Sequence, residues 1–500
     1  MLHEPAHTPD LGAPDFLLLA PGGAPVGCVE CKKPGAELQQ LIGGAQLEKY
    51  RALTPNIILT DYWRFHLLRE GALVEQAELT PAAAGQTAAV VKLLRNFMQA
   101  EANTLGTAEQ LAHALAGRCA PLREALKQEL EKQSPLEQSA LRGLFESFQN
   151  TIYQNIDHAA FADALAQTLV YSLLLAKLQA RPGDKLDLYS VERHIPKNFA
   201  LVREITKYLS ELPENVGYLV DNIMAVINAM DAAAIAESMQ YRGAYSDEDD
   251  PYLIFYETFL AAYDAALREK RGVYYTPPPV VKFIVRAADA VLKRDFGLPD
   301  GLGDRQVTAL DFAAGTGTFM LEMFRLALHG KERSKRDVLI RSHLLQNFFG
   351  FELLIAPYVI AHLKLSRFLS DMGAPLGRNE RIQVYLTNTL EHASKQVDIP
   401  FMPALTQEAN QAQQLKAKQK ILVVTGNPPY SGESQNKGAW ISELIDAYKQ
   451  VDGENLNERN PKSLQDDYVK FIRFAQWKME QVEEGVVAVI TNHALSLIHI

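Results

Sequence analysis

The pattern of apolar and polar positions divides the chain into three stretches. Before residue 81, short runs of apolar residues such as Asn56–Thr60 predict β-strands. From there to residue 265, apolar residues recur at helical spacing, as at Leu165, Leu169 and Leu173, which predicts an all-α bundle. From Val307 onward, apolar strands alternate with helical stretches, and this alternation is typical of a doubly wound α/β sheet.

The chain is therefore expected to be a multidomain α/β protein. It would have an α/β domain at 1–80, a helical connector at 81–265 and a doubly wound, Rossmann-like domain at 266–500. With 500 residues, 47% of them hydrophobic, it is long enough to bury a core in each part. We expect the connector to act as a spacer, and the polar, Gln-rich insertion at 388–420 to be mobile.

Composition limits the partners and the location of the protein. The sequence contains neither a long uncharged apolar run nor a signal peptide, so we expect a cytoplasmic protein without a membrane partner. The cysteines Cys28, Cys31 and Cys119 offer no second pair for zinc and are expected to be core thiols. A net charge of −10 disfavours DNA unless local basic patches such as Lys32-Lys33 contact phosphate. The helical stretch has no phosphate-loop motif, which argues against an ATP-driven motor.

The most specific chemical signal is the run Asn427-Pro428-Pro429-Tyr430 at the end of an apolar strand. Proline fixes φ and restricts the residue before it, so the Asn427 side chain and the Pro428 carbonyl would face one small volume. Two acceptors that grip a planar amino group would orient its lone pair toward an incoming methyl group, while Tyr430 stacks on the base. The alternative is that the run is only a rigid turn.

A glycine-rich turn lies upstream of that run. The sequence Asp311-Phe-Ala-Ala-Gly-Thr-Gly-Thr-Phe319 follows an apolar strand and precedes an apolar helix. Gly315 and Gly317 would let the backbone approach a ligand closely, and Asp311 lies at a strand end, where ligands bind in open parallel sheets. Taken alone, the turn fits an ordinary strand-to-helix connection equally well.

Together these motifs resemble the γ-type, amino-group DNA methyltransferases, in order through most of residues 272–493. The resemblance implies S-adenosylmethionine as cofactor, adenine N6 in DNA as target and extrusion of that adenine from the duplex. It gives the catalytic role to the four residues from Asn427 to Tyr430. The residues that it implies for the cofactor are Tyr275, Thr276 and Pro277 at the methionine end, Asp311, Ala313, Gly315, Gly317 and Phe319 in the loop, Glu352 at the ribose hydroxyls, and Asn388 beside the cofactor's adenine.

A second cluster of polar residues lies near the N-terminus. Alternate residues of a strand share a face, so Glu30 and Lys32 would point the same way, and Asp15 on the preceding strand would complete a hard-oxygen site suited to Mg²⁺. Lys32 would steady the attacking water or the developing charge. Gln46 and Tyr50 are four residues apart on a predicted helix and would face the same site. A Glu-x-Lys pair alone more often marks a solvated strand face.

The order of these five residues resembles the Pro-Asp…(Asp/Glu)-x-Lys nucleases that carry a Gln-x-x-x-Tyr helix. The resemblance implies a Mg²⁺-dependent endonuclease domain at 1–80, with Asp15 and Glu30 at the metal and Lys32 as a catalytic residue. These nucleases usually begin with a helix that has no counterpart before Asp15, so we expect the N-terminal helix to be missing. The alternative is an inactive relic that only binds DNA.

The order of all the parts resembles single-chain restriction-modification enzymes of the type IIG or type ISP-like kind. It implies a site-specific adenine DNA methyltransferase linked to an endonuclease, with double-stranded DNA as partner, in a chain that is incomplete at its C-terminus. A methyltransferase that acts on RNA or on a protein glutamine would use the same loop, because the requirement is a planar amino group. The sequence leaves the DNA recognition site and the oligomeric state open.

Overall fold

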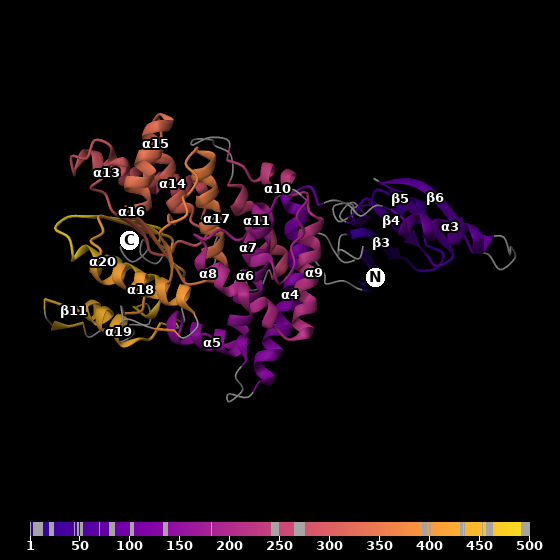
Figure 1. Cartoon of the computed structure of the whole chain (residues 1–500), viewed down its shortest axis with the longest axis horizontal. Coiled ribbons are helices and arrows are strands. Elements are labelled where there is room, and N and C mark those ends of the chain that lie inside the picture. The colour runs from indigo at the N-terminus through magenta and orange to yellow at the C-terminus, as the bar shows by residue number, and fades with distance from the viewer. Residues whose placement is uncertain are drawn as a thin grey trace.

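The structure is a computed structural model of the 500-residue chain. The residues that it describes are 2–3, 14–19, 25–44, 46–47, 50, 54–69, 71–79, 86–100, 105–133, 139–181, 183–241, 250–264, 276–392, 398–399, 402–430, 434, 436–452, 454–456 and 464–491. Both predicted domain boundaries, at 80 and at 265, fall outside these ranges and stay predictions. Figure 1 shows a small sheet at one end of the molecule, a second sheet at the other end, and a bundle of helices between them.

The N-terminal sheet has the strand order β1-β2-β3-β4-β5-β6, in which only β3 and β4 are parallel. Its strands are β1 Leu2–His3, β2 Phe16–Leu19, β3 Pro25–Cys31, β4 Asn56–Thr60, β5 Arg64–Arg69 and β6 Ala72–Glu78. The short helix α1 Leu38–Leu41 covers one face with Leu47 and Tyr50, and α3 Gln86–Met98 covers the other with Leu93 and Phe97. Helix α3, which the sequence assigns to the connector, therefore packs on this sheet.

The middle of the chain is a helical bundle around α6. Its helices are α4 Ala108–Lys132, α5 Ala140–Thr151, α6 His158–Gln179, α7 Val191–His194, α8 Ala200–Lys207, η1 Tyr208–Glu211, α9 Glu214–Ala229, α10 Ala232–Ser238 and α11 Pro251–Tyr263. Helix α6 is long and apolar enough to cross a membrane, with a mean hydropathy of 1.5, but 89% of that window is buried inside the protein. The apolar residues of α6 therefore form the core of the bundle, and they give no indication of a membrane span.

The second sheet has five parallel strands in the order β13-β10-β7-β8-β9. Its strands are β7 Ala309–Asp311, β8 Phe348–Glu352, β9 Val384–Leu386, β10 Val423–Gly426 and β13 Val486–Val489. Parallel strands buried on both faces carry continuous apolar runs, as Ala309-Leu310 and Val423-Val424 do here. This agrees with the doubly wound α/β sheet that the sequence predicts for this part.

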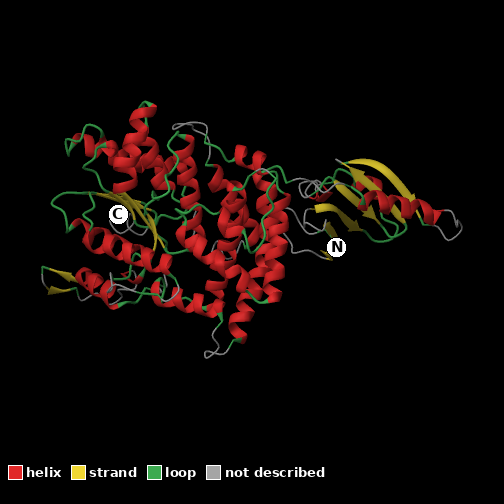
Figure 2. Cartoon of the chain, in the orientation of Figure 1, coloured by secondary structure: helices red, strands yellow, loops and turns green. Residues whose placement is uncertain are grey.

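Helices cover both faces of the parallel sheet (Figure 2). One layer, which packs on Ala309, Phe348 and Val423, consists of α13 Pro278–Arg294, α14 Thr318–Leu328 and α17 Ile355–Asp371. The opposite layer, which packs on Leu310 and Val424, consists of α18 Pro403–Lys418, α19 Ala439–Asp446 and α20 Asp467–Met479. The remaining elements are η2 Gly301–Gly303, α15 Arg333–Leu339, the π-helical turn η3 Ile340–Leu344, α16 Leu345–Asn347, η4 Ala447–Lys449, β11 Gln450–Val451 and β12 Glu454–Asn455.

The predicted mobile insertion at 388–420 is wrong in its central part, because 403–418 form the packed helix α18. Leu405, Ala409 and Ala412 of this helix are buried. Its N-terminus is also held from the bundle, where the Glu204 carboxylate accepts hydrogen bonds from the backbone N–H groups of Ala404 (2.9 Å) and Leu405 (3.0 Å). A carboxylate at a helix N-terminus satisfies free donors and interacts favourably with the helix dipole.

A buried ion pair also joins the bundle to the sheet domain. The Lys364 ammonium on α17 is fully buried and pairs with Asp250, the residue that caps the N-terminus of α11. Asp250 also accepts a hydrogen bond from the Tyr241 hydroxyl at 2.8 Å, and Lys364 donates one to the Thr318 hydroxyl at 3.2 Å. Removing one partner of a buried pair leaves an uncompensated charge, which is more costly than losing the pair as a whole.

Lys364→Met should therefore destabilise the protein by about 3 kcal/mol, measured by urea unfolding. Adding Asp250→Asn should recover part of this loss, because the double variant leaves no unpaired carboxylate. The matched control is Lys127→Met, which removes the exposed pair with Glu131 (3.9 Å) and should cost less than about 0.5 kcal/mol. Equal effects of the two lysine substitutions would contradict a structural role for the buried pair.

Candidate active site

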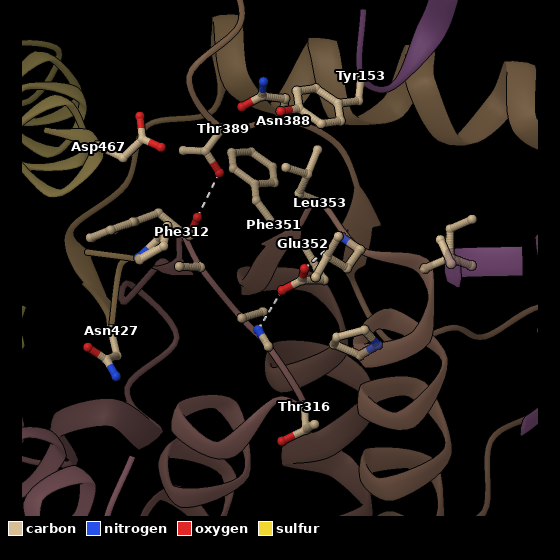
Figure 3. A pocket seen from close by; sticks show the side chains of 18 of the residues that line it. Tyr153, Phe312, Thr316, Phe351, Glu352, Leu353, Asn388, Thr389, Asn427 and Asp467 are labelled. Atoms are coloured by element: carbon tan, nitrogen blue, oxygen red, sulfur yellow. Dashed lines mark hydrogen bonds between the residues drawn. The ribbon is translucent and has the colours of Figure 1, made fainter. Parts of the chain in front are cut away.

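The parallel sheet reverses its winding between β7 and β10. From β7 the chain adds β8 and β9 on one side, and then returns to add β10 and β13 on the other. Ligands of open α/β sheets bind at such a switch point, beyond the carboxyl ends of the strands. A cavity of about 450 Å³ lies at this position. The loops after β7, β8, β9 and β10 all contribute to its lining (Figure 3).

The structure brings most of the predicted cofactor residues to this cavity. Those that line it are Thr276, Ala313, Gly315, Phe319, Glu352 and Asn388, together with Asn427 and Pro429 from the predicted catalytic run. Among the described residues, Pro277, Asp311, Gly317, Pro428 and Tyr430 lie near it without lining it. Tyr275 lies outside the described residues.

The glycine-rich turn has the backbone that the sequence suggests. Gly315 and Gly317 have φ values of 54° and 78°, in the left-handed region that favours glycine. A Cβ on Gly317 would lie 3.2 Å from Ala361 Cβ of α17, so a side chain there would also crowd the helix packing. A Cβ on Gly315 would meet nothing within 4 Å. Gly315 therefore keeps the floor of the cavity open, and Gly317 allows α14 to start immediately behind it.

Asp311 lies at the end of β7 with no exposed surface. One carboxylate oxygen accepts a hydrogen bond from the Ala313 N–H at 3.3 Å, and the other, Oδ2, is buried without a hydrogen-bond partner. Burial raises the pKa of Asp311 to about 8; the Ala313 N–H opposes this rise, while Glu352 adds to it. A buried acceptor without a donor is costly unless a ligand supplies one.

Glu352 joins the end of β8 to the glycine-rich turn. Its carboxylate accepts hydrogen bonds from the backbone N–H groups of Gly315 and Leu354, both at 2.7 Å. Burial raises the pKa of Glu352 to about 7, and these backbone donors limit the rise. Figure 3 shows the Glu352 carboxylate bonded to the glycine-rich turn. Glu352 lines the cavity, and its remaining lone pairs can accept hydrogen bonds from hydroxyl groups.

The amide of Asn427 is held at both ends. Its Nδ2 donates a hydrogen bond to the Thr276 hydroxyl at 2.9 Å, and its Oδ1 accepts one from the Tyr430 hydroxyl at 2.8 Å. The Tyr430 ring meets the Tyr468 ring edge to face at 6.1 Å. The run is therefore more than a rigid turn, because it orients an amide acceptor at the wall of the cavity.

The helical bundle forms one wall of the cavity, and the sequence did not predict this. Phe148, Ile152, Tyr153 and Ile156, from α5 and the turn before α6, line the cavity, as does Glu257 of α11. The expectation that the connector is only a spacer is therefore wrong. These residues show the helical spacing of any core, so sequence periodicity could not distinguish them from buried packing.

A polar network on the other side of the cavity was also missed. Asp467, at the start of α20, accepts hydrogen bonds from the side chains of Ser434 (2.5 Å) and Asn436 (3.0 Å). The Lys470 ammonium donates to the Ser434 hydroxyl at 2.7 Å. Asp467 and Asn436 line the cavity, and the network fixes the positions of Ser434 and Asn436.

The polar residues of the N-terminal sheet also come together. The Lys32 ammonium lies 2.6 Å from Glu30 Oε1 and 2.9 Å from Gln46 Oε1, and the Gln46 amide donates to Glu30 Oε1 and to the Tyr50 hydroxyl, each at 2.9 Å. Glu30 Oε2 is buried without a hydrogen-bond partner. Asp15 accepts a hydrogen bond from the Cys31 N–H at 2.6 Å. The described residues contain no group of three or more His, Cys, Asp or Glu side chains that would hold a metal ion by themselves.

Comparisons with known proteins agree with the geometry of the cavity. Residues 250–495 match the family described as N-6 DNA Methylase. Over these residues the chain is similar to N-6 DNA methylases. The match contains the glycine-rich turn, Glu352 and the Asn-Pro-Pro-Tyr run. The curated proteins include no significant match to the chain.

Solved structures with this fold include DNA complexes. The DrdV–DNA complex aligns with 97% of this chain and 44% of its own, at 22% identity and a TM-score of 0.55. The ATP-dependent Type ISP restriction-modification enzyme LlaBIII bound to DNA aligns with 77% of this chain and 25% of its own, at 20% identity and a TM-score of 0.55. A nuclease-deletion mutant of the Type ISP restriction-modification enzyme LlaGI, in complex with a DNA substrate mimic, aligns with 78% of this chain and 30% of its own, at 18% identity and a TM-score of 0.50. This chain therefore spans less than half of each of these proteins.

The raised pKa of Asp311 predicts how the stability of the parallel-sheet domain depends on pH. The folded pKa of about 8 exceeds the ordinary value of 3.8, so between these values the folded chain binds more protons than the unfolded chain. The stability contributed by Asp311 is thus fully present below pH 3.8 and is lost as the pH rises through about 8.

Asp311→Asn should remove this dependence, because the amide does not titrate. The variant should melt at a higher temperature than the wild type at pH 8.5 and at a similar temperature at pH 4.5, measured by differential scanning fluorimetry without cofactor. Glu443→Gln, which changes an exposed carboxylate of the same domain, is the control and should follow the wild type. A constant difference between Asp311→Asn and the wild type at both pH values would contradict the assigned titration.

Proposed function

We propose that the protein is an adenine-N6 DNA methyltransferase that takes its methyl group from S-adenosylmethionine. The observation that carries this proposal is that one cavity at the switch point is lined both by the glycine-rich turn and by the oriented amide of Asn427. One side suits a nucleoside cofactor and the other suits a planar amino group.

The donor groups around the cavity fit S-adenosylmethionine. Glu352 would accept the ribose hydroxyls, and Gly315 would let the backbone approach the cofactor. Asp311 has an unsatisfied carboxylate oxygen beneath the turn, which a donor at the methionine end would satisfy, directly or through water. Thr276 would lie at the same end, where it already positions Asn427. When bound, the cofactor supplies an electrophilic methyl group on its sulfonium.

The target amine would be held by Asn427. Its Oδ1 and the Pro428 carbonyl would accept the two N–H bonds of the adenine amino group, so that the nitrogen lone pair faces the cofactor. The Tyr430 hydroxyl donates one hydrogen bond to Asn427 Oδ1, and the second lone pair of that oxygen would accept the adenine amine. Tyr430 and Pro429 would then contact the extruded base, which a stacked duplex could not present to the cavity.

We further propose that the N-terminal sheet is a Mg²⁺-dependent endonuclease, so that the whole is a restriction-modification enzyme. The buried, unpartnered Glu30 Oε2 is the observation that fits a cation, since Mg²⁺ is bound by one or two carboxylates and several waters. Asp15 would share the ion, and Lys32 would act on the attacking water. Gln46 holds Lys32 and Glu30 in place, and Tyr50 accepts a hydrogen bond from Gln46. Linkage to this sheet favours DNA over RNA or a protein glutamine as the methyl acceptor.

Asn427→Ala should slow methyl transfer about 100-fold or more, because the lost acceptor acts chiefly in the transition state. The affinity of this variant for S-adenosylmethionine should differ from that of the wild type by less than about 3-fold. Tyr430→Phe is the matched variant, since it keeps the ring and frees Asn427 Oδ1, and it should retain most of the rate. The measurement is single-turnover transfer of labelled methyl groups to duplex DNA, with RNA and protein acceptors in parallel. Normal turnover by Asn427→Ala, or transfer to RNA or protein alone, would overturn the assignment.

Lys32→Ala and Glu30→Gln should abolish Mg²⁺-dependent cleavage of plasmid DNA and leave methyl transfer unchanged, because the two sites lie on separate sheets. Lys92→Ala, which changes an exposed lysine of α3 away from this cluster, is the control and should retain cleavage. Cleavage that is equal in the wild type and both site variants, or absent from the wild type, would favour the inactive relic.

A further inference from the structure

The order of the strands fixes the direction in which a nucleoside cofactor lies. Asn427 follows β10, the glycine-rich turn follows β7, Glu352 ends β8 and Asn388 follows β9, and these strands are neighbours in that order. If the reacting methyl group lies at Asn427 and the ribose at Glu352, the base of the cofactor lies over the loop after β9. This placement rests on the proposed function.

Asn388, which the sequence assigns to this end, is already engaged by the protein. Its Oδ1 accepts a hydrogen bond from the Leu390 N–H at 3.0 Å, and its Nδ2 donates to Glu391 (3.1 Å) and to Asn436 (2.8 Å). Its amide orientation is fixed by the Leu390 donor. Asn388 therefore shapes the loop and has no N–H left to donate to a base, although Oδ1 keeps one lone pair.

Two further elements hold the loop after β9. The Lys416 ammonium on α18 is buried and donates hydrogen bonds to the carbonyl oxygens of Asn388 (2.7 Å) and Glu391 (2.9 Å). On the other side, the backbone N–H of Gln154 in the turn between α5 and α6 donates a hydrogen bond to the Glu391 carboxylate. The loop is thus held between the helical bundle and α18.

The bundle also fixes α18 itself. Glu204 of α8 caps the N-terminus of α18, and Glu408 of α18 accepts a hydrogen bond from the Leu386 N–H at the end of β9, at 3.0 Å. Contacts from the bundle therefore reach the loop directly through Gln154 and indirectly through α18. Tyr153, next to Gln154, lines the cavity, and Figure 3 shows its ring beside Asn388.

We propose that the nucleobase end of the methyl-donor site is shared between the methylase domain and the helical bundle, with Tyr153 contacting the adenine of the cofactor and Lys416 acting as a positioning residue. Tyr153 presents a large, amphipathic ring at the end of the cavity that the strand order assigns to the base. Lys416 holds the two carbonyl groups between which the loop turns.

The first test is binding of S-adenosylhomocysteine and of 5′-methylthioadenosine, which lacks the amino-acid end, by calorimetry on the full chain. Tyr153→Ala should weaken both ligands by the same factor, about 10-fold, and Tyr153→Phe should bind within about 3-fold of the wild type. The control is Tyr189→Ala, which removes a ring of the same bundle that is 82% exposed, and it should bind normally. Unchanged affinity in Tyr153→Ala, or a loss confined to S-adenosylhomocysteine, would overturn the placement of Tyr153 at the base.

The second test needs no ligand. Lys416→Met should speed amide hydrogen exchange in the segment 387–391 by about 10-fold or more, and should leave the strand β10 unchanged. Lys418→Met, which changes an exposed lysine on the same helix, is the control. If the segment 387–391 exchanges at the wild-type rate in Lys416→Met, the positioning role of Lys416 is overturned. A wild-type chain that binds neither ligand would overturn the proposed methyl-donor site, and the exchange result would still decide whether Lys416 holds the loop.

Discussion

The position of the cavity and of the residues around it depends on the reversal of winding between β7 and β10 in the parallel sheet. At that point the connections leave in opposite directions, so no crossover covers the carboxyl ends of the two strands. The cavity, the glycine-rich turn and the Asn-Pro-Pro-Tyr run all lie there. The strand order also places Glu352 and Asn388 at increasing distance from Asn427, and so gives the cavity a direction.

Three largely buried ionisable groups lie in or close to the wall of the cavity. Burial raises the pKa values of Asp311 and Glu352 to about 8 and about 7, and it lowers the pKa of Lys416 to about 7 although Glu391 partly opposes the shift. Buried ionisable groups with shifted pKa values lower the stability of a protein. They are retained where they bind a ligand or hold a loop in place. In this chain Glu352 lines the cavity, Asp311 is buried at the end of β7 before the glycine-rich turn, and Lys416 holds the loop after β9.

Sequence reasoning recovered the parts of the site whose residues carry a chemical requirement. Gly315 and Gly317 need left-handed backbone, and Asn427 needs the restriction that proline imposes, so each leaves a local signal that the structure reproduces. The same holds for Glu30 and Lys32, which alternate along one strand and meet. The two-layer covering of the parallel sheet was also predictable, because its strands are apolar on both faces.

What the sequence could not give depends on contacts between distant segments. Tyr153 and Gln154 occupy a turn between ordinary bundle helices, and only the tertiary fold brings them to the loop after β9. The polar composition of 403–418 suggested a mobile insertion, but Glu408 and Lys416 are the buried polar face of a packed helix. Polar residues at core positions reverse the usual pattern, so periodicity alone predicts such helices poorly.

The central claim is that the cavity at the switch point is a methyl-donor site. A crystal structure of the chain with S-adenosylhomocysteine at saturating concentration tests it most directly. The account predicts the ribose hydroxyls on Glu352, the adenine beside Tyr153 and the loop after β9, and the sulfur on the side of Asn427. An empty cavity at saturation, or the ligand bound elsewhere or in the opposite direction, would contradict the account.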